Sequence, residues 1–400
     1  MNTQMKRRQF LAGTAALGTA GALVPAAKPA AQTVKKNGLT VSDVQMLQVK
    51  GNDNRTSLYC KISTKEGVEG FYGPVDADAG LFVDRYFRKP LLGQDPLAHE
   101  AYWDRMFRAH RHARGSHYLM GLSAVDNALW DLKGRYFGVP VYRLLGGNRD
   151  RVRVYASALG LSQEPEAMQA KARELKQEGF RHQKWFLRDR GAKHGPEGLD
   201  LDVEVVRLLR EAVGYGVDLM FDAFSTWDYN HAAAWAKRVE QYVPRWIEEP
   251  FPTANIDAFV ELAHETTVPI ATGEHFYNRW DVHNFLQAGA ISVVQADPEW
   301  CGGVSELVKM CTLASVHGAH VVPHGHSIHA AMHIVASQPE EVCPLVEYLL
   351  NKMGGNYYYF EKHRIVPEGG LITLPEEPGF GIELDESKIA DLRPVHWNRT

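Results

Sequence analysis

The chain has 400 residues, of which 45% are hydrophobic and 23% are charged, and its formal net charge is −4. That length is enough to bury a large core and favours two domains. The charge balance gives no basic surface for nucleic acid, and beyond the N-terminus no apolar run reaches the roughly 18 residues needed to span a bilayer. We therefore expect no nucleic-acid partner and, once the N-terminal segment is removed, no membrane association.

Residues 1–32 have the composition of an export signal. A Lys-Arg-Arg-Gln-Phe-Leu run at residues 6–11 precedes a small-residue apolar stretch that ends in proline and alanine. This order of regions is typical of a cleaved signal, and the arginine pair resembles a twin-arginine signal. Cleavage near Ala26 or near Ala31 fits equally, and a disordered basic terminus is the alternative. The predicted location is the periplasm.

The next segment predicts a separate α+β domain over residues 38–145. Residues 39–50 and 56–73 alternate as strands do, and residues 121–138 have the periodicity of an amphipathic helix. Strands followed by helices are typical of an α+β arrangement. The four cysteines in the whole chain are too few for a disulfide framework, and we interpret them as core thiols.

From residue 150 short apolar strands alternate with helical segments, such as those at 164–178 and 230–241. This alternation favours an α/β fold with a parallel sheet, and eight units favour a (β/α)8-type, TIM-like barrel over residues 150–355. The alternative is an open doubly wound sheet, which the lack of an early glycine-rich phosphate loop disfavours. The eight strand candidates lie at residues 152–157, 182–187, 216–224, 245–250, 268–275, 291–298, 318–326 and 344–349.

Polar residues recur where consecutive strand candidates end. Asp222, Glu248 and Glu274 follow one another at intervals of 26 residues, Asp297 comes 23 residues later, and His324 comes 27 residues after that. One strand–helix unit of a compact barrel has about this length, so the side chains should lie at one height above the barrel mouth. Three converging carboxylates in a partly dry site need a cation, and oxygen ligands favour Mg²⁺.

Asp297 and His324 should lie within hydrogen-bonding distance because they end neighbouring strands. A carboxylate on one ring nitrogen fixes the imidazole tautomer and raises its basicity, which makes His324 the preferred general base or acid. His326 and His275 are the competing candidates. Glu249 should point to the other side of its strand end, where it could orient a neighbouring base or form a salt bridge.

Several of these segments together resemble one family. The motifs "FDAF", "WIEEP", "ATGEH", "VVQADPEWCGGVSE" and "VVPHGH" are similar to those of the enolase superfamily, of the mandelate racemase/muconate lactonizing enzyme type and the mandelate racemase subgroup. The resemblance covers about residues 38–385. It includes a junction between capping domain and barrel at residues 128–147 and a C-terminal return strand at residues 374–385. Residues 356–400 should therefore return to an N-terminal capping domain.

The resemblance implies a reaction that removes the proton α to a carboxylate and forms an enolate stabilised by Mg²⁺. It implies Asp222, Glu248 and Glu274 as Mg²⁺ ligands, and His324 with Asp297 as the catalytic dyad. Glu347, on the eighth strand, would hydrogen-bond the substrate carboxylate or the enolate oxygen.

Two positions depart from the subgroup pattern. Where members often carry Lys-x-Lys, this chain has Lys184 and Phe186, so the base on the opposite face is replaced; Phe224 stands where some sugar-acid dehydratases use a histidine. The remaining pattern resembles dehydratases of the rhamnonate dehydratase type. Lys184 should bind a substrate oxygen, or else form a structural salt bridge.

The predicted function is therefore dehydration of a sugar acid, an aldonate, to a 2-keto-3-deoxy acid. The alternatives are a racemase or epimerase of a 2-hydroxy acid and a non-catalytic periplasmic sugar-acid-binding protein. Arg55, His275 and His326 are the candidate substrate-binding residues. The segment 108–117, rich in His and Arg, is either a solvated loop or a contact to polyhydroxyl ligands or to another subunit, and we expect a homo-oligomer.

The export signal is testable at its arginine pair. Replacing Arg7 and Arg8 together by lysine should leave the protein in the cytoplasm, because lysine keeps the charge but loses the paired guanidinium groups. Cell fractionation with immunodetection measures the distribution. Unchanged periplasmic delivery of the double variant would contradict the assignment.

Overall fold

The computed structural model describes residues 38–187 and 195–397. The export signal predicted for residues 1–32 lies outside the described residues, as do residues 188–194 and 398–400. Within the described ranges, none of the helices combines the length and the apolar character that crossing a bilayer requires.

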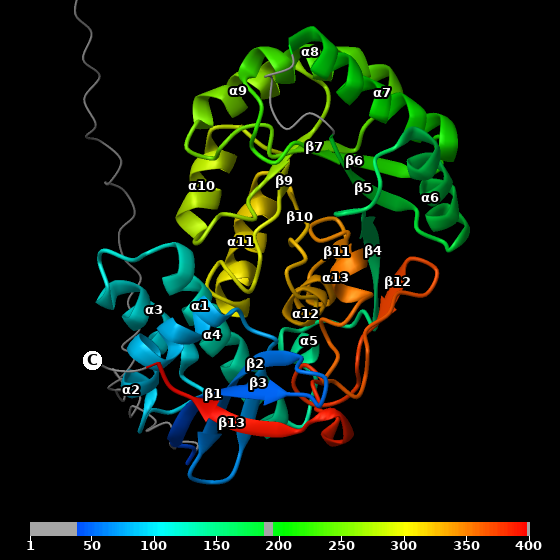
Figure 1. Ribbon diagram of the computed structural model, residues 1–400. Helices are drawn as coiled ribbons and strands as arrows, with labels where there is room; N and C mark the ends of the chain where they lie inside the picture. Colours follow the sequence, from blue (N-terminus) through cyan, green and yellow to red (C-terminus); the bar gives the residue numbers. More distant parts are fainter. Residues whose placement is uncertain (1–37, 188–194, 398–400) are drawn as a thin grey trace, which may run out of the picture. The chain divides into compact units, whose positions relative to one another are not determined.

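The N-terminal part of the described chain forms a four-stranded antiparallel sheet in the order β13-β1-β2-β3 (Figure 1). One face of β1 is buried, including Val44 and Met46, as expected for a strand that covers a core on one side. The strands are β1 (Val41–Lys50), β2 (Thr56–Thr64), β3 (Glu69–Tyr72) and β13 (Asp391–Val395).

Helices follow these strands, as the sequence predicts. The longest, α4 (Ser116–Phe137), includes all of the helix expected at residues 121–138 except Gly138, which caps its C-terminus, and it contacts β3 and β2. Fifteen of its residues are buried, which shows that α4 has protein on more than one side. The others are α1 (Ala77–Phe82), the π-helical turn η1 (Val83–Phe87), α2 (Arg88–Leu91), α3 (His99–Ala109) and α5 (Val141–Leu144).

The eight strands predicted for the barrel are all present and parallel, in the order β10-β9-β8-β7-β6-β5-β4-β11. The (β/α)8-type architecture with an N-terminal antiparallel domain is confirmed. The strands are β4 (Arg151–Ser157), β5 (His182–Phe186), β6 (Asp218–Asp222), β7 (Trp246–Glu248), β8 (Ile270–Thr272), β9 (Val293–Val294), β10 (His320–Val321) and β11 (Val346–Leu349).

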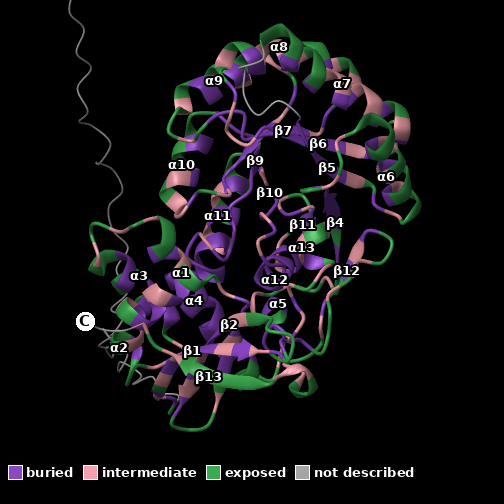
Figure 2. Cartoon of the chain, viewed as in Figure 1, coloured by how far each residue is buried: buried purple, intermediate pink, exposed green. Residues whose placement is uncertain are grey.

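Helices lie outside the strands, and Figure 2 shows exposed and buried residues on the same helices, whereas the strands are largely buried. This is the pattern of amphipathic helices that pack on a buried parallel sheet. The helices are α6 (Pro165–Gln177), α7 (Gly195–Val213), α8 (Tyr229–Val239), the 3₁₀ turn η3 (Glu240–Tyr242), α9 (Ile256–Glu265), α10 (Arg279–Gln287), α11 (Val304–Val316), α12 (His329–Ser337) and α13 (Leu350–Met353).

The barrel has a seam between β10 and β11, which form no strand pair among the described residues. β10 is only two residues long. The backbone N–H of Val321 donates to Val342 O, upstream of β11, at 2.8 Å. The N–H of Gly325 donates to the Glu347 carboxylate at 2.9 Å. A loop carbonyl and a side chain therefore replace the missing ladder at this seam.

The prediction of a return strand at residues 374–385 is wrong. That segment makes only isolated bridges, Pro140 with Gly379 and Glu361 with Leu384, because its two prolines and two glycines disfavour a continuous strand. The strand that returns to β1 is β13, which follows the 3₁₀ turn η4 (Glu386–Lys388). A short strand before the segment, β12 (Leu371–Thr373), pairs antiparallel with β4.

Polar side chains of α4 hold the loop that follows β9. Asn127 donates to Pro298 O at 3.1 Å and accepts from the N–H of Val304 at 3.0 Å. Asp126 accepts from the backbone N–H of Ser305 at 2.9 Å and from its hydroxyl at 2.7 Å. These buried hydrogen bonds fix the N-terminus of α11 and the loop 298–305 against the N-terminal domain.

Gly303 in this loop tests how closely the two parts fit. Its φ is +89°, and a Cβ would lie 2.4 Å from an Asp126 carboxylate oxygen, whereas Gly146 has φ +88° and open space around it. Gly146→Ala should cost about 1–2 kcal/mol from the left-handed backbone alone. Gly303→Ala should cost at least about 2 kcal/mol more, because the clash is added.

Urea-induced unfolding of the two variants and the parent measures the difference between them. Equal losses of unfolding free energy for Gly303→Ala and Gly146→Ala would show that the loop moves away from Asp126 at little cost, and would contradict a close fit between the two parts.

Candidate active site

The interior of the barrel is a small apolar layer, separate from the main core. Polar side chains follow it two residues later on most strands, because side chains on a strand alternate between its faces and positions i and i+2 share a face. The following polar residues are Asp222, Glu248, Gln295, His324 and Glu347. The apolar layer consists of Tyr155, Met220, Trp246, Ala271, Val293, Val322 and Leu345.

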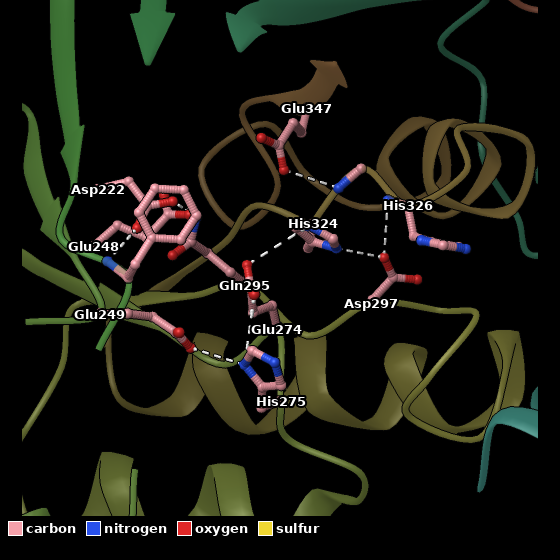
Figure 3. Close-up of polar contacts among 12 residues, drawn as sticks. Asp222, Glu248, Glu249, Glu274, His275, Gln295, Asp297, His324, His326 and Glu347 are labelled. Atoms are coloured by element: carbon pink, nitrogen blue, oxygen red, sulfur yellow. Dashed lines mark hydrogen bonds and ion pairs between the residues drawn. The ribbon is translucent and has the colours of Figure 1, made fainter. Parts of the chain in front are cut away.

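Glu274 reaches the same region by a different path, since it comes three residues after Ala271. The intervening Gly273 has φ +126°, a conformation that glycine adopts readily. The residue that faces the barrel mouth after β8 is therefore the third after Ala271, not the second. The Glu274 carboxylate then lies 3.6 Å from His324 Nε2 and 3.5 Å from His275 Nδ1 (Figure 3).

Lys184 on β5 lies among the carboxylates. Its Nζ is 2.5 Å from Glu248, 2.9 Å from Glu347 and 3.6 Å from Asp222. Only 2% of the lysine is exposed. Burial disfavours the ammonium, but Glu248, Glu347 and Asp222 outweigh that effect and raise the pKa of Lys184 well above its ordinary value. The structure thus places Lys184 in a buried ion-pair cluster, and its role as a donor to a substrate oxygen stays a prediction.

The carboxylates of this cluster have shifted pKa values because burial opposes their charge. Burial raises the pKa of Glu248 to about 8 and that of Asp222 to about 6, although Lys184 acts in the opposite direction. Burial would also raise the pKa of Glu347, but Lys184 and His324 outweigh it and lower the value to about 2. Glu347 is therefore ionised, whereas Lys184 alone does not offset the cost of a buried negative charge at Glu248.

Gln295 was missed by the sequence reasoning. Its Nε2 donates to Glu248 Oε2 at 2.6 Å, and the indole of Trp246 donates to the same oxygen at 3.1 Å. The signal was present in the sequence, because Gln295 lies two residues before Asp297 at the same strand end and an amide there faces the barrel mouth.

The expected contact between Asp297 and His324 is present. The ring nitrogen Nδ1 of His324 donates to Asp297 Oδ2 at 2.8 Å, and the backbone N–H groups of His326 and Glu299 donate to the same carboxylate at 3.0 and 2.7 Å. Asp297 is fully buried, so these donors hold its carboxylate in place. The second ring nitrogen of His324, Nε2, faces Glu274.

Burial alone would lower the pKa of His324. The carboxylates of Glu274, Asp297 and Glu347 outweigh burial and raise the value to about 10. In this charge state the imidazole is protonated at neutral pH, and a cation near Glu274 would favour the neutral form.

Glu249 turns away from Glu248, as expected. It has φ +43°, and its carboxylate accepts from Ser225 at 2.9 Å and Thr272 at 3.0 Å and lies 3.4 Å from His275 Nδ1. Burial would raise the pKa of Glu249, but the hydrogen bonds from His275, Ser225 and Thr272 lower it. Glu249 thus forms a salt bridge, one of the two roles proposed for it.

The donor atoms that converge most closely are not the predicted metal set. Among the described residues, Glu249, Glu274 and His275 place one ligand atom each within 4.8 Å of one another, and this set shares only Glu274 with the prediction. Both oxygens of Glu248 have other partners, which are Lys184, Trp246 and Gln295. The all-oxygen set of Asp222, Glu248 and Glu274, with pKa values raised by burial, still has the chemistry that suits a hard divalent cation.

His326 lies beside the dyad and bridges to two residues that the sequence did not single out. Lys352 on α13 donates to its Nδ1 at 2.9 Å, so Nε2 carries a hydrogen and donates to Asp76 at 3.1 Å. Trp300 packs against the rings of both His324 and His326, with centroids 4.9 and 5.0 Å apart. Asp76 precedes α1, so this chain of contacts joins the N-terminal domain to the barrel mouth.

Arg55 and His275 differ in their placement. Arg55 pairs with Asp53 at 3.2 Å and lies 4.3 Å from the ring centroid of Tyr359, with no recorded contact to the carboxylate cluster within the described residues. His275 borders the cluster, and its side chain is half exposed. The segment 108–117 approaches the barrel mouth at Gly115, which faces the Tyr277 ring. The substrate-binding roles of Arg55, His275 and His326 remain predictions.

Family models match two parts of this chain. Residues 33–146 match the N-terminal domain of mandelate racemase/muconate lactonizing enzymes, and residues 167–388 match the enolase C-terminal domain-like family. The chain belongs to the mandelate racemase/muconate lactonizing enzyme family. The resemblance drawn from the strand-end motifs is confirmed.

Named members of this family are similar to the chain over most of its length. The L-rhamnonate dehydratase of Saccharopolyspora erythraea is 33% identical over 82% of this chain and 83% of that protein. The arabinonate dehydratase of Saccharolobus solfataricus is 31% identical (83% and 89%), and the D-galactarolactone cycloisomerase of Agrobacterium fabrum is 31% identical (85% and 92%). Such relatives are consistent with a lyase-type enzyme.

Solved structures share the fold. An enolase superfamily member from Salmonella Typhimurium superposes with a TM-score of 0.80 at 26% identity, over 90% of this chain and all of that one. The 3,6-anhydro-D-galactonate cycloisomerase from Zobellia galactanivorans gives 0.75 at 27% identity, over 88% and 100%.

Proposed function

We propose that the protein is a Mg²⁺-dependent dehydratase that converts an aldonate to a 2-keto-3-deoxy acid. The observation that carries the proposal is the pair Asp297–His324, with Nδ1 bound to the Asp297 carboxylate and Nε2 directed at Glu274. A binding protein would need no imidazole fixed in this way. The named relatives include dehydratases of arabinonate and L-rhamnonate, which supports an acid-sugar substrate.

Phe186 supports dehydration over two-base racemisation. It stands where the family resemblance places the second lysine, and its ring stacks on Phe224 with centroids 4.9 Å apart. Neither ring can accept a proton, so these two positions provide no base for the opposite face of the substrate carbon. A single base that later acts as an acid fits elimination of water.

Asp222, Glu248 and Glu274 would hold the metal. When bound, Mg²⁺ would offset their negative charge and stabilise the charge that develops on the substrate carboxylate. Lys184 is the nearby ammonium donor for an anionic oxygen, and Glu347, ionised and accepting from Gly325 N–H, orients it.

His324 performs both proton transfers in this proposal. As a neutral imidazole, oriented by Asp297, it accepts the proton from C2 of the aldonate at Nε2. The imidazolium then donates that proton to the C3 hydroxyl, which leaves as water while the C2–C3 double bond forms. The resulting enol takes up a proton at C3 and releases the proton of its C2 hydroxyl, which gives the 2-keto-3-deoxy acid. The net change is the loss of one water molecule.

The metal ligands can be separated from the alternative group by three variants. After removal of divalent ions with EDTA, calorimetric titration with Mg²⁺ should show binding weakened at least about tenfold in Glu248→Gln, because one ligand charge is lost. Glu249→Gln and His275→Gln should bind Mg²⁺ as the parent does. If Glu249→Gln and His275→Gln weaken Mg²⁺ binding and Glu248→Gln does not, the metal is held by Glu249, Glu274 and His275, and the predicted set is refuted.

The reaction class is decided at His324. His324→Asn keeps a similar shape but cannot take the proton, so dehydration should fall by at least about 10². The control His317→Asn, at an exposed histidine that ends α11, should keep full activity. Fold and Mg²⁺ binding should persist in both variants.

A screen of acid sugars in D₂O, followed by NMR, measures the products. Dehydration gives a 2-keto-3-deoxy acid with solvent deuterium at C3. Recovery of only intact hydroxy acid with deuterium at C2 and inverted configuration would replace this proposal with a racemase or epimerase.

A further inference from the structure

Two of the four cysteines lie close together in the core. The Sγ atoms of Cys311, on α11, and Cys343, three residues before β11, are 3.6 Å apart, although the residues are 32 positions apart in the chain. Both are buried, with exposures of 1% and 0%. Cys60 and Cys301 are also buried free thiols. The prediction of core thiols is therefore confirmed, and the approach of one pair is an additional finding.

Both sulfurs are carried by well-anchored backbone. The N–H of Cys343 donates to Pro339 O at 2.9 Å, and its carbonyl accepts from Arg149 at 3.2 Å. Arg149 also donates to Gln338 O at 2.7 Å, which holds the segment before β11 from a second side. On α11, Cys311 is flanked by buried Met310. Because the two Sγ atoms are already 3.6 Å apart, only a small movement is needed to bring them to bonding distance.

The pair also lies at the one place where the barrel ladder is interrupted in the described chain. Cys311 belongs to the helix that precedes β10, and Cys343 belongs to the segment that precedes β11. Next to it, Val342 O accepts the backbone hydrogen bond from Val321 of β10 at 2.8 Å. A covalent link between the two cysteines would join the elements on both sides of the seam.

We propose that Cys311 and Cys343 are a modification site that forms an intramolecular disulfide on exposure to a disulfide oxidant, closing the β10–β11 seam. The sulfurs need to approach by about 1.5 Å to reach the S–S bond length of about 2.05 Å. One thiolate attacks the oxidant's disulfide and releases one thiol, and the second thiolate then displaces the other. Two protons leave the cysteines, and the oxidant is reduced to two thiols.

Burial makes this reaction slow in the closed structure. The contact with Cys343 and burial together raise the pKa of the Cys311 thiol, so few thiolates form, and the pair reacts mainly during folding or local opening. A reducing cytoplasm keeps such a pair as dithiol, whereas an oxidising compartment allows the bond. The inference concerns the seam alone and does not depend on the proposed dehydratase activity.

The test uses the full chain, unfolded in denaturant with dithiothreitol and then refolded either in oxidised glutathione or in dithiothreitol. Free thiols are alkylated, and the digest is analysed by mass spectrometry. We expect a Cys311–Cys343 linked peptide pair, two alkylated cysteines in place of four, and a melting temperature about 4–8 °C higher in the oxidised form, since the link constrains the unfolded chain.

Cys343→Ala should abolish both the linked pair and the temperature shift, while Cys60→Ala, a matched buried thiol, should keep both. If the Cys343 variant fails to fold, the peptide map of the parent protein still shows whether the Cys311–Cys343 bond forms. Four alkylated cysteines after oxidative refolding, or a bond from Cys311 to Cys301, would overturn the site. A correct bond with no rise in melting temperature would overturn the closing role.

Discussion

Repulsion among buried carboxylates is the constraint on which the barrel mouth depends. Asp222, Glu248, Glu274 and Glu347 lie on or just after different strands of one parallel sheet, and Lys184 is the ammonium in direct contact with three of them. Burying like charges together is unfavourable unless cations and hydrogen-bond donors offset them. The amide of Gln295, the indole of Trp246 and the backbone N–H of Gly325 serve as such donors. The mouth is thus built to hold negative charge that one lysine does not balance.

The opposite pKa shifts of two glutamates show how this charge is distributed. The cations Lys184 and His324 outweigh burial at Glu347, which stays ionised, whereas at Glu248 burial, with Asp222 and Glu347, outweighs Lys184 and raises the pKa. A proton or a metal cation can relieve that penalty at Glu248. A cation bound at Glu274 would lower the pKa of His324, because Glu274 is the carboxylate that faces its Nε2. Cation binding and the protonation state of the imidazole are therefore linked through one carboxylate.

The strand-end residues could be predicted from sequence because a repeated strand–helix unit sets their spacing and their height. The sequence could not give the contacts that depend on how distant segments meet: Asp76 with His326, Lys352 beside the dyad, or the choice of Glu249 over Glu248 as the partner of His275. The return strand was misplaced for a local reason, since the motif-bearing segment 374–385 is broken by proline and glycine and the pairing strand lies beyond it.

The hydrogen bonds from α4 to the loop 298–305 bear on how readily the two parts of such a protein can be recombined. That loop begins directly after Asp297, and α4 supplies the partners of several of its backbone groups through Asn127, Asp126 and Ser123. A chimera that took its first 146 residues from another family member would leave those groups buried without partners unless the donor helix carried the same side chains. The helix and the loop therefore have to be exchanged together, although some 170 residues separate them in the chain.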